Sequence, residues 1–184
     1  MNALELTRHG PRDRLGLKGA RAAEWLAANG IPVPGTPNTW TSLQHPAAAD
    51  ALLVARLGAS EFFLEERPGG TTLKGIAPSL DERWPGVYPV LREDSAFRLD
   101  GEGVHEVLAQ VCNVNFAVLA LDARPLIMTL MIGVAVLIVP QTGDGDFDER
   151  RYCIWCDPTF GAYLGESLGG VVVQCGGTYT GVRG

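Results

Sequence analysis

Two cysteines separated by two residues are the first side chains that could do chemistry. Cys153 and Cys156 have the C-x-x-C spacing of redox dithiols and of half a zinc site. A redox dithiol sits at a helix N-terminus, where the dipole lowers the thiol pKa, but the helix expected here begins only after Asp157. A four-cysteine zinc site would need Cys112 and Cys175 to converge on the pair. Buried, reduced cysteine is therefore the favoured interpretation, with a redox dithiol and a zinc site as alternatives.

Glycine turns and histidines are the next candidates for a reactive or nucleotide-binding site. The turns at residues 101–103 and 143–145 lack the lysine and threonine of a P-loop, and no G-x-G-x-x-G fingerprint follows a strand. His9, His45 and His105 have no nearby cysteine, serine or aspartate at a spacing that specifies nucleophilic catalysis. His105 falls on the flank of its helix opposite the apolar stripe, so we expect it to be exposed. The sequence thus shows no nucleotide loop and no catalytic dyad.

A third feature is the segment CNVNF at residues 112–116, which follows an amphipathic helix. Its two amides can hydrogen-bond to backbone in a turn, and the phenylalanine can return the chain to the core. A structural helix exit is the simpler interpretation; a partner-facing surface or a vestigial ligand pocket is the functional one. The charged residues after the strand expected at residues 87–91 have the same two interpretations. The candidate partner-facing residues are Cys112, Asn113, Asn115, Phe116, Arg92 and Asp94.

An internal repeat indicates which elements position these residues. Residues 17–27 align with residues 99–109, and both copies read as strand, glycine turn and helix. In the second copy, valine and leucine recur at i, i+3, i+4 and i+7, which places them on one helical face. Glycines, prolines and charges at residues 67–85 suggest a loop-rich connection. The repeat therefore predicts two pseudo-symmetric halves, 1–84 and 85–184.

A third helix is predicted near the C-terminus. Asp157 can accept free amide hydrogens as the N-cap, and Pro158 suits the first helical position. A short strand is expected before it at residues 152–155, and a loose glycine-rich tail after it at residues 176–184. Its apolar stripe is expected to contain Phe160, Tyr163, Leu164 and Leu168, and Gly169 and Gly170 are expected to end it. Short strands mixed with three helices, without regular βαβ alternation, predict an α+β fold.

Two further segments have features of both helix and strand. Residues 126–139 are apolar apart from Thr129, but they are fewer than the roughly 20 residues that a helix needs to cross a bilayer. Gly133 divides this run, so we expect buried β-structure with a bend or bulge at the glycine. The sequence does not decide between helix and strand for residues 47–66, because good helix formers are followed by the signature of a hairpin turn at residues 58–61.

Composition narrows the class of protein. The chain has 184 residues, of which 46% are hydrophobic, so it can bury a core. Its net charge of −6 and pI near 5.0 argue against binding to nucleic acid or anionic lipid. The N-terminal residues show no secretory signal, so we expect a cytoplasmic protein without a membrane span.

Blocks along nearly the whole chain resemble the gamma subunits of heterotetrameric sarcosine oxidase and the related N-methylglutamate dehydrogenase. Their ordered combination is more specific than any single block. They lie at residues 16–19, 25–26, 31–34, 37–40, 56–58, 61–62, 87–92, 110–116 and 156–161.

The resemblance implies a fold related to the folate-binding domain of the glycine-cleavage aminomethyltransferase, built from two α+β halves. It also implies a non-catalytic chain that binds no cofactor or metal and packs mainly on the alpha subunit, beside beta and delta subunits. FAD, FMN, NAD and tetrahydrofolate are expected on those partners, which oxidise sarcosine or a related N-methyl amino acid. The one-carbon unit then passes to tetrahydrofolate.

Two alternatives from other classes stay open. One is a stand-alone folate-binding one-carbon transferase or regulator, for which Asp94 and Asp100 are the nearest candidates for a folate-gripping carboxylate. The other is a thiol or zinc protein that uses Cys153 and Cys156. The sequence does not identify the amine or the electron acceptor of a complex, because the amine-binding subunit is another chain.

Overall fold

The chain forms two compact units. The computed structural model describes residues 3–45, 48–80, 84–142 and 150–181. The small unit is Arg12–Arg92, and the large unit combines Met1–Pro11 with Glu93–Gly184. These units differ from the predicted halves 1–84 and 85–184. The first strand pairs with a strand that follows residue 93, so the N-terminus belongs to the large unit.

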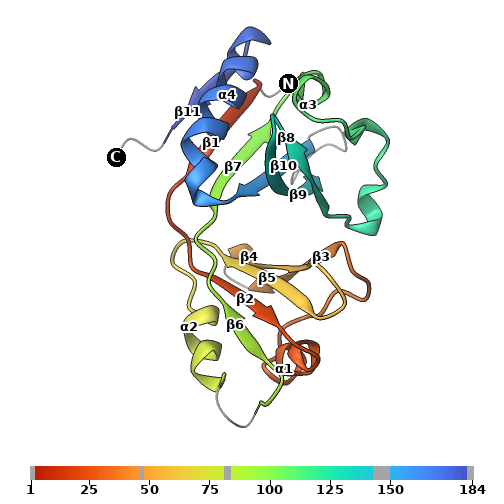
Figure 1. Ribbon diagram of the computed structural model, residues 1–184, viewed down its shortest axis with the longest axis vertical. Coiled ribbons are helices and arrows are strands. Elements are labelled where there is room, and N and C mark those ends of the chain that lie inside the picture. The colour runs from red at the N-terminus through yellow and green to blue at the C-terminus, as the bar shows by residue number, and fades with distance from the viewer. Residues whose placement is uncertain (1–2, 46–47, 81–83, 143–149, 182–184) are drawn as a thin grey trace. The chain divides into compact units, whose positions relative to one another are not determined.

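The small unit is a five-stranded sheet with short helices (Figure 1). Its strands follow the order β3-β4-β5-β2-β6, and every neighbouring pair is antiparallel. Its core contains Leu17, Trp25, Leu26, Phe62 and Leu64. In chain order its elements are β2 (Arg14–Lys18), α1 (Ala22–Ala28), β3 (Thr39–His45), β4 (Ala48–Arg56), β5 (Glu61–Glu66), α2 (Thr72–Ile76), the 3-10 turn η1 (Ala77–Ser79) and β6 (Tyr88–Val90).

The segment left open at residues 47–66 is a β-hairpin. Strands β4 and β5 pair in register from Leu52 opposite Glu66 to Arg56 opposite Phe62. Leu52 and Val54 are fully buried at alternate positions, so packing overrides the helix propensity of the flanking alanines. Residue 47 lies outside the described residues. Helix α2 and turn η1 lie where only a loop-rich connection was predicted.

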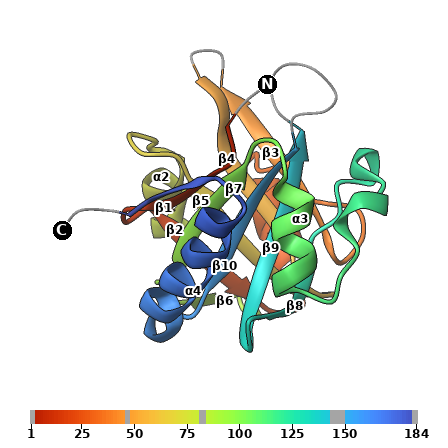
Figure 2. The same ribbon diagram turned by 90° about the horizontal axis from the view of Figure 1, so that it is seen from above.

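The large unit is a six-stranded sheet in the order β11-β1-β7-β10-β9-β8. Only the edge pair β1–β11 is parallel. Helices α3 and α4 cover the same face of this sheet (Figure 2), and their buried residues share one core with it. Its elements are β1 (Glu5–His9), β7 (Ser95–Asp100), α3 (Val104–Val111), η2 (Phe116–Val118), η3 (Leu121–Ala123), β8 (Ile127–Met131), β9 (Val134–Thr142), β10 (Arg150–Cys156), η4 (Pro158–Phe160), α4 (Gly161–Gln174) and β11 (Thr178–Thr180).

The predicted strand, glycine turn and helix occur in both units. Gly19 joins β2 to α1 with φ +131°, and Gly101 joins β7 to α3 with φ +100°. A Cβ atom on Gly19 would overlap the carbonyl oxygen of Gly86, and one on Gly101 would overlap that of Ala3. Both turns therefore need glycine, for backbone conformation and for space. In each case the approaching backbone leads into the strand that pairs beside the turn, β6 beside β2 and β1 beside β7.

The apolar run at residues 126–139 is β-structure, as predicted, but it is a hairpin rather than a bent or bulged strand. It is also less buried than expected, because Met128 and Leu130 of β8 are exposed. Ile132 and Gly133 form the two-residue turn between β8 and β9, with φ +49° and +79°. Positive φ at both central positions is the geometry of a type I′ turn. Among the described residues, no helix is long and apolar enough to cross a membrane.

The predicted cap at Asp157 is present, but it begins the 3-10 turn η4, and helix α4 follows only from Gly161. The Asp157 carboxylate accepts the Thr159 amide hydrogen at 2.9 Å, as expected of a cap. The helix does not end at Gly169 and Gly170 but continues to Gln174, and Gly176 then stops it with φ +81°.

The predicted apolar stripe and the predicted loose tail also differ from the structure. Leu164, Leu168 and Val172 are fully buried, whereas Phe160 and Tyr163 are both 51% exposed. The expected loose tail contains strand β11, which pairs with β1. Residues 182–184 and the glycine turn at 143–145 lie outside the described residues.

Candidate functional site

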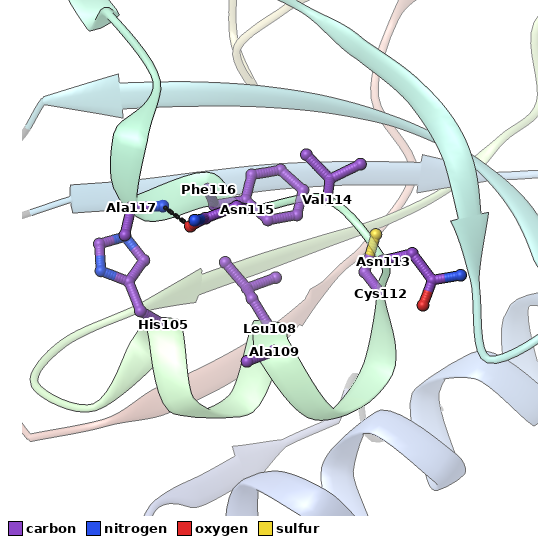
Figure 3. A pocket seen from close by; sticks show the side chains of 9 residues that line it. All are labelled: His105, Leu108, Ala109, Cys112, Asn113, Val114, Asn115, Phe116 and Ala117. Atoms are coloured by element: carbon purple, nitrogen blue, oxygen red, sulfur yellow. Dashed lines mark hydrogen bonds between the residues drawn. The ribbon is translucent and has the colours of Figure 1, made fainter.

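A cavity of about 460 Å³ opens between helix α3 and the CNVNF segment (Figure 3). Both elements belong to the large unit, so the whole lining comes from one compact body. The cavity is lined by His105, Leu108, Ala109, Cys112, Asn113, Val114, Asn115, Phe116 and Ala117. The segment singled out from the sequence is thus joined by one face of the helix that precedes it.

The apolar part of the lining is anchored in the core. Leu108 is 1% exposed and Phe116 is 2% exposed. The Phe116 ring meets the fully buried Tyr152 of β10 edge to face, with centroids 5.4 Å apart. Aromatic pairs prefer this arrangement, so it holds Phe116 in place against the sheet. The prediction that Phe116 returns the chain to the core is confirmed.

His105 was expected to be exposed to solvent, and this expectation is wrong. Its side chain is half-buried, and its Nε2 atom lies 2.7 Å from the Tyr152 hydroxyl oxygen, at hydrogen-bond distance. The two rings are also 5.9 Å apart at an interplanar angle of 73°. The sequence could not reveal this pair, because its members are 47 residues apart on different elements. His105 is a cavity residue that sequence reasoning missed.

The CNVNF segment divides into anchors and exposed amides. Cys112 is 8% exposed, and its backbone makes an antiparallel bridge to Met131 of β8. Asn115 accepts the Ala117 amide hydrogen at 3.2 Å and so caps turn η2. The Asn113 and Asn115 side chains are exposed. Of the four candidates in this segment, these two can reach another molecule, and their partner-facing role stays a prediction.

The other two candidates are not among the residues that line the cavity. Arg92 belongs to the small unit, where its guanidinium group lies 4.8 Å from the centroid of the Phe63 ring. Asp94 belongs to the large unit, and its charge helps to raise the pKa of the Cys156 thiol. The partner-facing role of Arg92 and Asp94 stays a prediction.

The positions of Cys153 and Cys156 argue against a shared redox or metal site. They are three residues apart in strand β10, so their side chains point to opposite faces of the sheet. Burial, reinforced by the charges of Asp94 and Asp157, raises the pKa of Cys156 to about 11. At neutral pH this thiol is protonated and a poor nucleophile. Among the described residues, no group of three His, Cys, Asp or Glu side chains could hold a metal ion.

Comparison with protein families and with curated proteins gives no match. Solved structures share the fold. A chain of the heterotetrameric sarcosine oxidase from Corynebacterium sp. U-96, solved with pyrrole 2-carboxylate, matches with a TM-score of 0.68 and 20% identity. The match covers 92% of this chain and 83% of that one.

Glycine cleavage system aminomethyltransferase T from Bartonella henselae matches with a TM-score of 0.67 and 15% identity. This match covers 97% of the chain but 48% of the enzyme, so the chain spans about half of the enzyme's length. The expected α+β fold, shared by sarcosine oxidase and the aminomethyltransferase, is confirmed.

Proposed function

We propose that this chain is the non-catalytic gamma subunit of a cytoplasmic, heterotetrameric sarcosine-oxidase-type complex, in which it supports assembly against the alpha subunit. The observation that carries the proposal is the structural match over most of both chains to a chain of a heterotetrameric sarcosine oxidase. The aminomethyltransferase matches equally well in fold but is about twice as long. The match covers 83% of the sarcosine oxidase chain but 48% of the aminomethyltransferase.

The chemistry of the cavity supports an accessory role. Its ionisable side chains are His105 and Cys112, and its exposed polar groups are the two asparagine amides. His105 is hydrogen-bonded to Tyr152, and Cys112 is buried. Such a lining suits hydrogen-bonded recognition better than bond breaking. In this proposal FAD, FMN, NAD and tetrahydrofolate belong to partner subunits, and the complex oxidises sarcosine or a related N-methyl amino acid.

The proposal includes an origin of the two units as diverged copies. The strand order β3-β4-β5-β2-β6 of the small unit corresponds to β8-β9-β10-β7-β1 of the large unit. In both orders a glycine turn links the fourth strand to a helix. Strand β1 comes before the small unit in sequence but pairs with β7 in the large unit. Strand β6 comes just before β7 in sequence but pairs with β2 in the small unit. This correspondence supports pseudo-symmetric halves that have exchanged one strand.

Omission of the chain tests the proposed role. We expect that the amine-oxidising partners, expressed without this chain, fail to form the full complex and lose turnover. Adding the purified chain should restore both, because burial of its surface stabilises the assembled state by mass action. Size and turnover of the complex, measured with and without the chain, provide the readout. Normal assembly and turnover without the chain would contradict the proposal.

A stand-alone folate-binding protein is the second candidate, because the fold is shared with an aminomethyltransferase. Of the two carboxylates considered for gripping folate, Asp100 does not fit that role. Asp100 lies 3.1 Å from Arg98 Nε and 3.6 Å from Arg151 Nε, so its charge is already paired. Asp94 acts electrostatically on Cys156. We expect titration of the isolated chain with tetrahydrofolate, followed by calorimetry, to show no saturable heat; saturable binding would favour this second candidate.

A further inference from the structure

The outer face of helix α4 has an unusual composition for a solvent-facing helix. We define this outer face by the exposed residues Tyr163, Glu166, Gly170, Val173 and Gln174. Tyr163 is 51% exposed and Val173 is 59% exposed, and Phe160 in the preceding turn is 51% exposed. A surface helix normally presents charged and polar residues on the side away from the core. Here Glu166 is the one charged residue of the five, so the face is suited to burial.

Gly170 gives a second and independent observation. Gly165 and Gly169 face inward, where a Cβ atom would press on Tyr179 or Phe97. Gly170 faces outward, has no positive φ, and a Cβ atom there would meet nothing within 4 Å. Glycine inside a helix is destabilising relative to alanine, and no contact among the described residues requires it here. A small residue at this position allows another backbone to approach the helix closely.

The charged residues of and around α4 indicate what kind of partner would bind this face. From residue 157 to residue 180 the only charged side chains are Asp157 and Glu166, and both are acidic. Arg8 lies at the start of the helix, with its Nη2 atom 3.4 Å from Ser95 Oγ and its guanidinium group over the Phe97 ring, and its positive charge offsets one of these negative charges. Asp94 adds a further negative charge at that end. A partner with arginine or lysine around an apolar centre would complement this face, and arginine can also stack on Tyr163 or Phe160.

We propose that the outer face of α4, with Phe160 at its edge, docks on a partner subunit whose surface presents an apolar patch rimmed by basic side chains. This inference rests on the proposed function, because it requires a multisubunit complex. A second copy of the chain is a poorer occupant, since it would bring a second Glu166 to the interface and no basic residue of α4 to pair with it. A membrane surface is also poorer, because helices that bind anionic lipid carry lysine and arginine on their polar side.

Substitutions at Gly170 separate folding from docking. Gly170→Ala should raise the midpoint of thermal unfolding of the free chain by about 2–4 °C, because alanine favours the helix. Gly170→Leu should leave the free chain folded and lower its affinity for the partner subcomplex about tenfold or more, because the side chain blocks close approach. Tyr163→Ser should lower that affinity by a similar factor, and Glu166→Lys should lower it through charge reversal. Affinity is measured by calorimetry with the purified partner subcomplex.

Matched controls lie elsewhere on the surface. Leu91→Ser removes a side chain that is 80% exposed in the small unit, and Glu102→Lys reverses an exposed charge outside α4. Both controls should bind like the wild type. If the Gly170→Leu and Tyr163→Ser variants bind with wild-type affinity, the outer face of α4 is not the docking surface, while the proposed function stays intact. A dimer of the free chain that these variants disrupt would also overturn this docking surface, by assigning the face to a second copy. Failure of the wild type itself to bind would instead reject the proposed function.

Discussion

Gly101→Ala is expected to destabilise the large unit by about 4 kcal/mol or more, which is among the largest effects that a single methyl group can have. The glycine has φ +100°, and an added Cβ atom would overlap the backbone of Ala3 and Leu4. A side chain can rotate away from such a contact, but this backbone enters β1, which pairs with β7 along five residues. Relief of the overlap would therefore displace β1 from its place between β11 and β7.

Gly103→Ala is the matched control two residues away. Gly103 also has positive φ, at +83°, but a Cβ atom there would meet nothing within 4 Å. Its replacement should cost only the conformational penalty, about 1–2 kcal/mol. Urea unfolding followed by far-ultraviolet circular dichroism measures both losses. Equal losses for the two variants would show that the contact with Ala3 is unimportant.

Glu65→Ala should destabilise the small unit by about 3–5 kcal/mol. The Glu65 carboxylate lies 2.7 Å from Arg14 Nε and 3.0 Å from Arg12 Nη1. The Arg14 side chain is 4% exposed, so loss of the carboxylate would leave a guanidinium charge without its ion partner inside the protein. The cost of a buried charge that has lost its Glu65 partner, rather than the lost attraction, accounts for most of the expected destabilisation.

The same two strands provide a control for this prediction. Lys18 and Glu61 face each other across β2 and β5, as Arg14 and Glu65 do, and their ion pair has a distance of 3.2 Å. Because both side chains are solvent-accessible, Glu61→Ala should cost about 0.2–1 kcal/mol. Chemical denaturation of both variants gives the comparison. A loss below about 1 kcal/mol for Glu65→Ala would mean that Arg14 finds another way to be solvated.

Local signals predicted the elements whose contacts are close in sequence. The repeated strand, glycine turn and helix, the cap at Asp157 and the break in β-structure at Gly133 all depend on residues within a few positions of each other. The pairing of β1 with β7 joins residues about 90 positions apart, and no local pattern specifies it. The hairpin of β4 and β5 was undecided because alanine propensity and tertiary packing favoured different structures.

In the candidate site, too, local features were predictable from the sequence and contacts between distant residues were not. The CNVNF segment was visible because asparagines follow an amphipathic helix, and the structure places it on a cavity. The hydrogen bond of His105 to Tyr152 was not visible, because helical periodicity places His105 away from the apolar stripe. Periodicity describes one helix at a time, whereas this contact depends on how the helix lies on strand β10. The exposure of Phe160 and Tyr163 was missed for the same reason.

The central claim is that the chain acts by assembling other subunits, and omission with re-addition tests it most directly. Sedimentation velocity and amine turnover would be measured on the partner subunits alone and after adding purified chain in equal molar amount. We predict that the partners alone give a smaller, inactive particle and that addition produces one heterotetramer with full turnover. Partners that sediment at the same size and turn over at the same rate without the chain would contradict the claim.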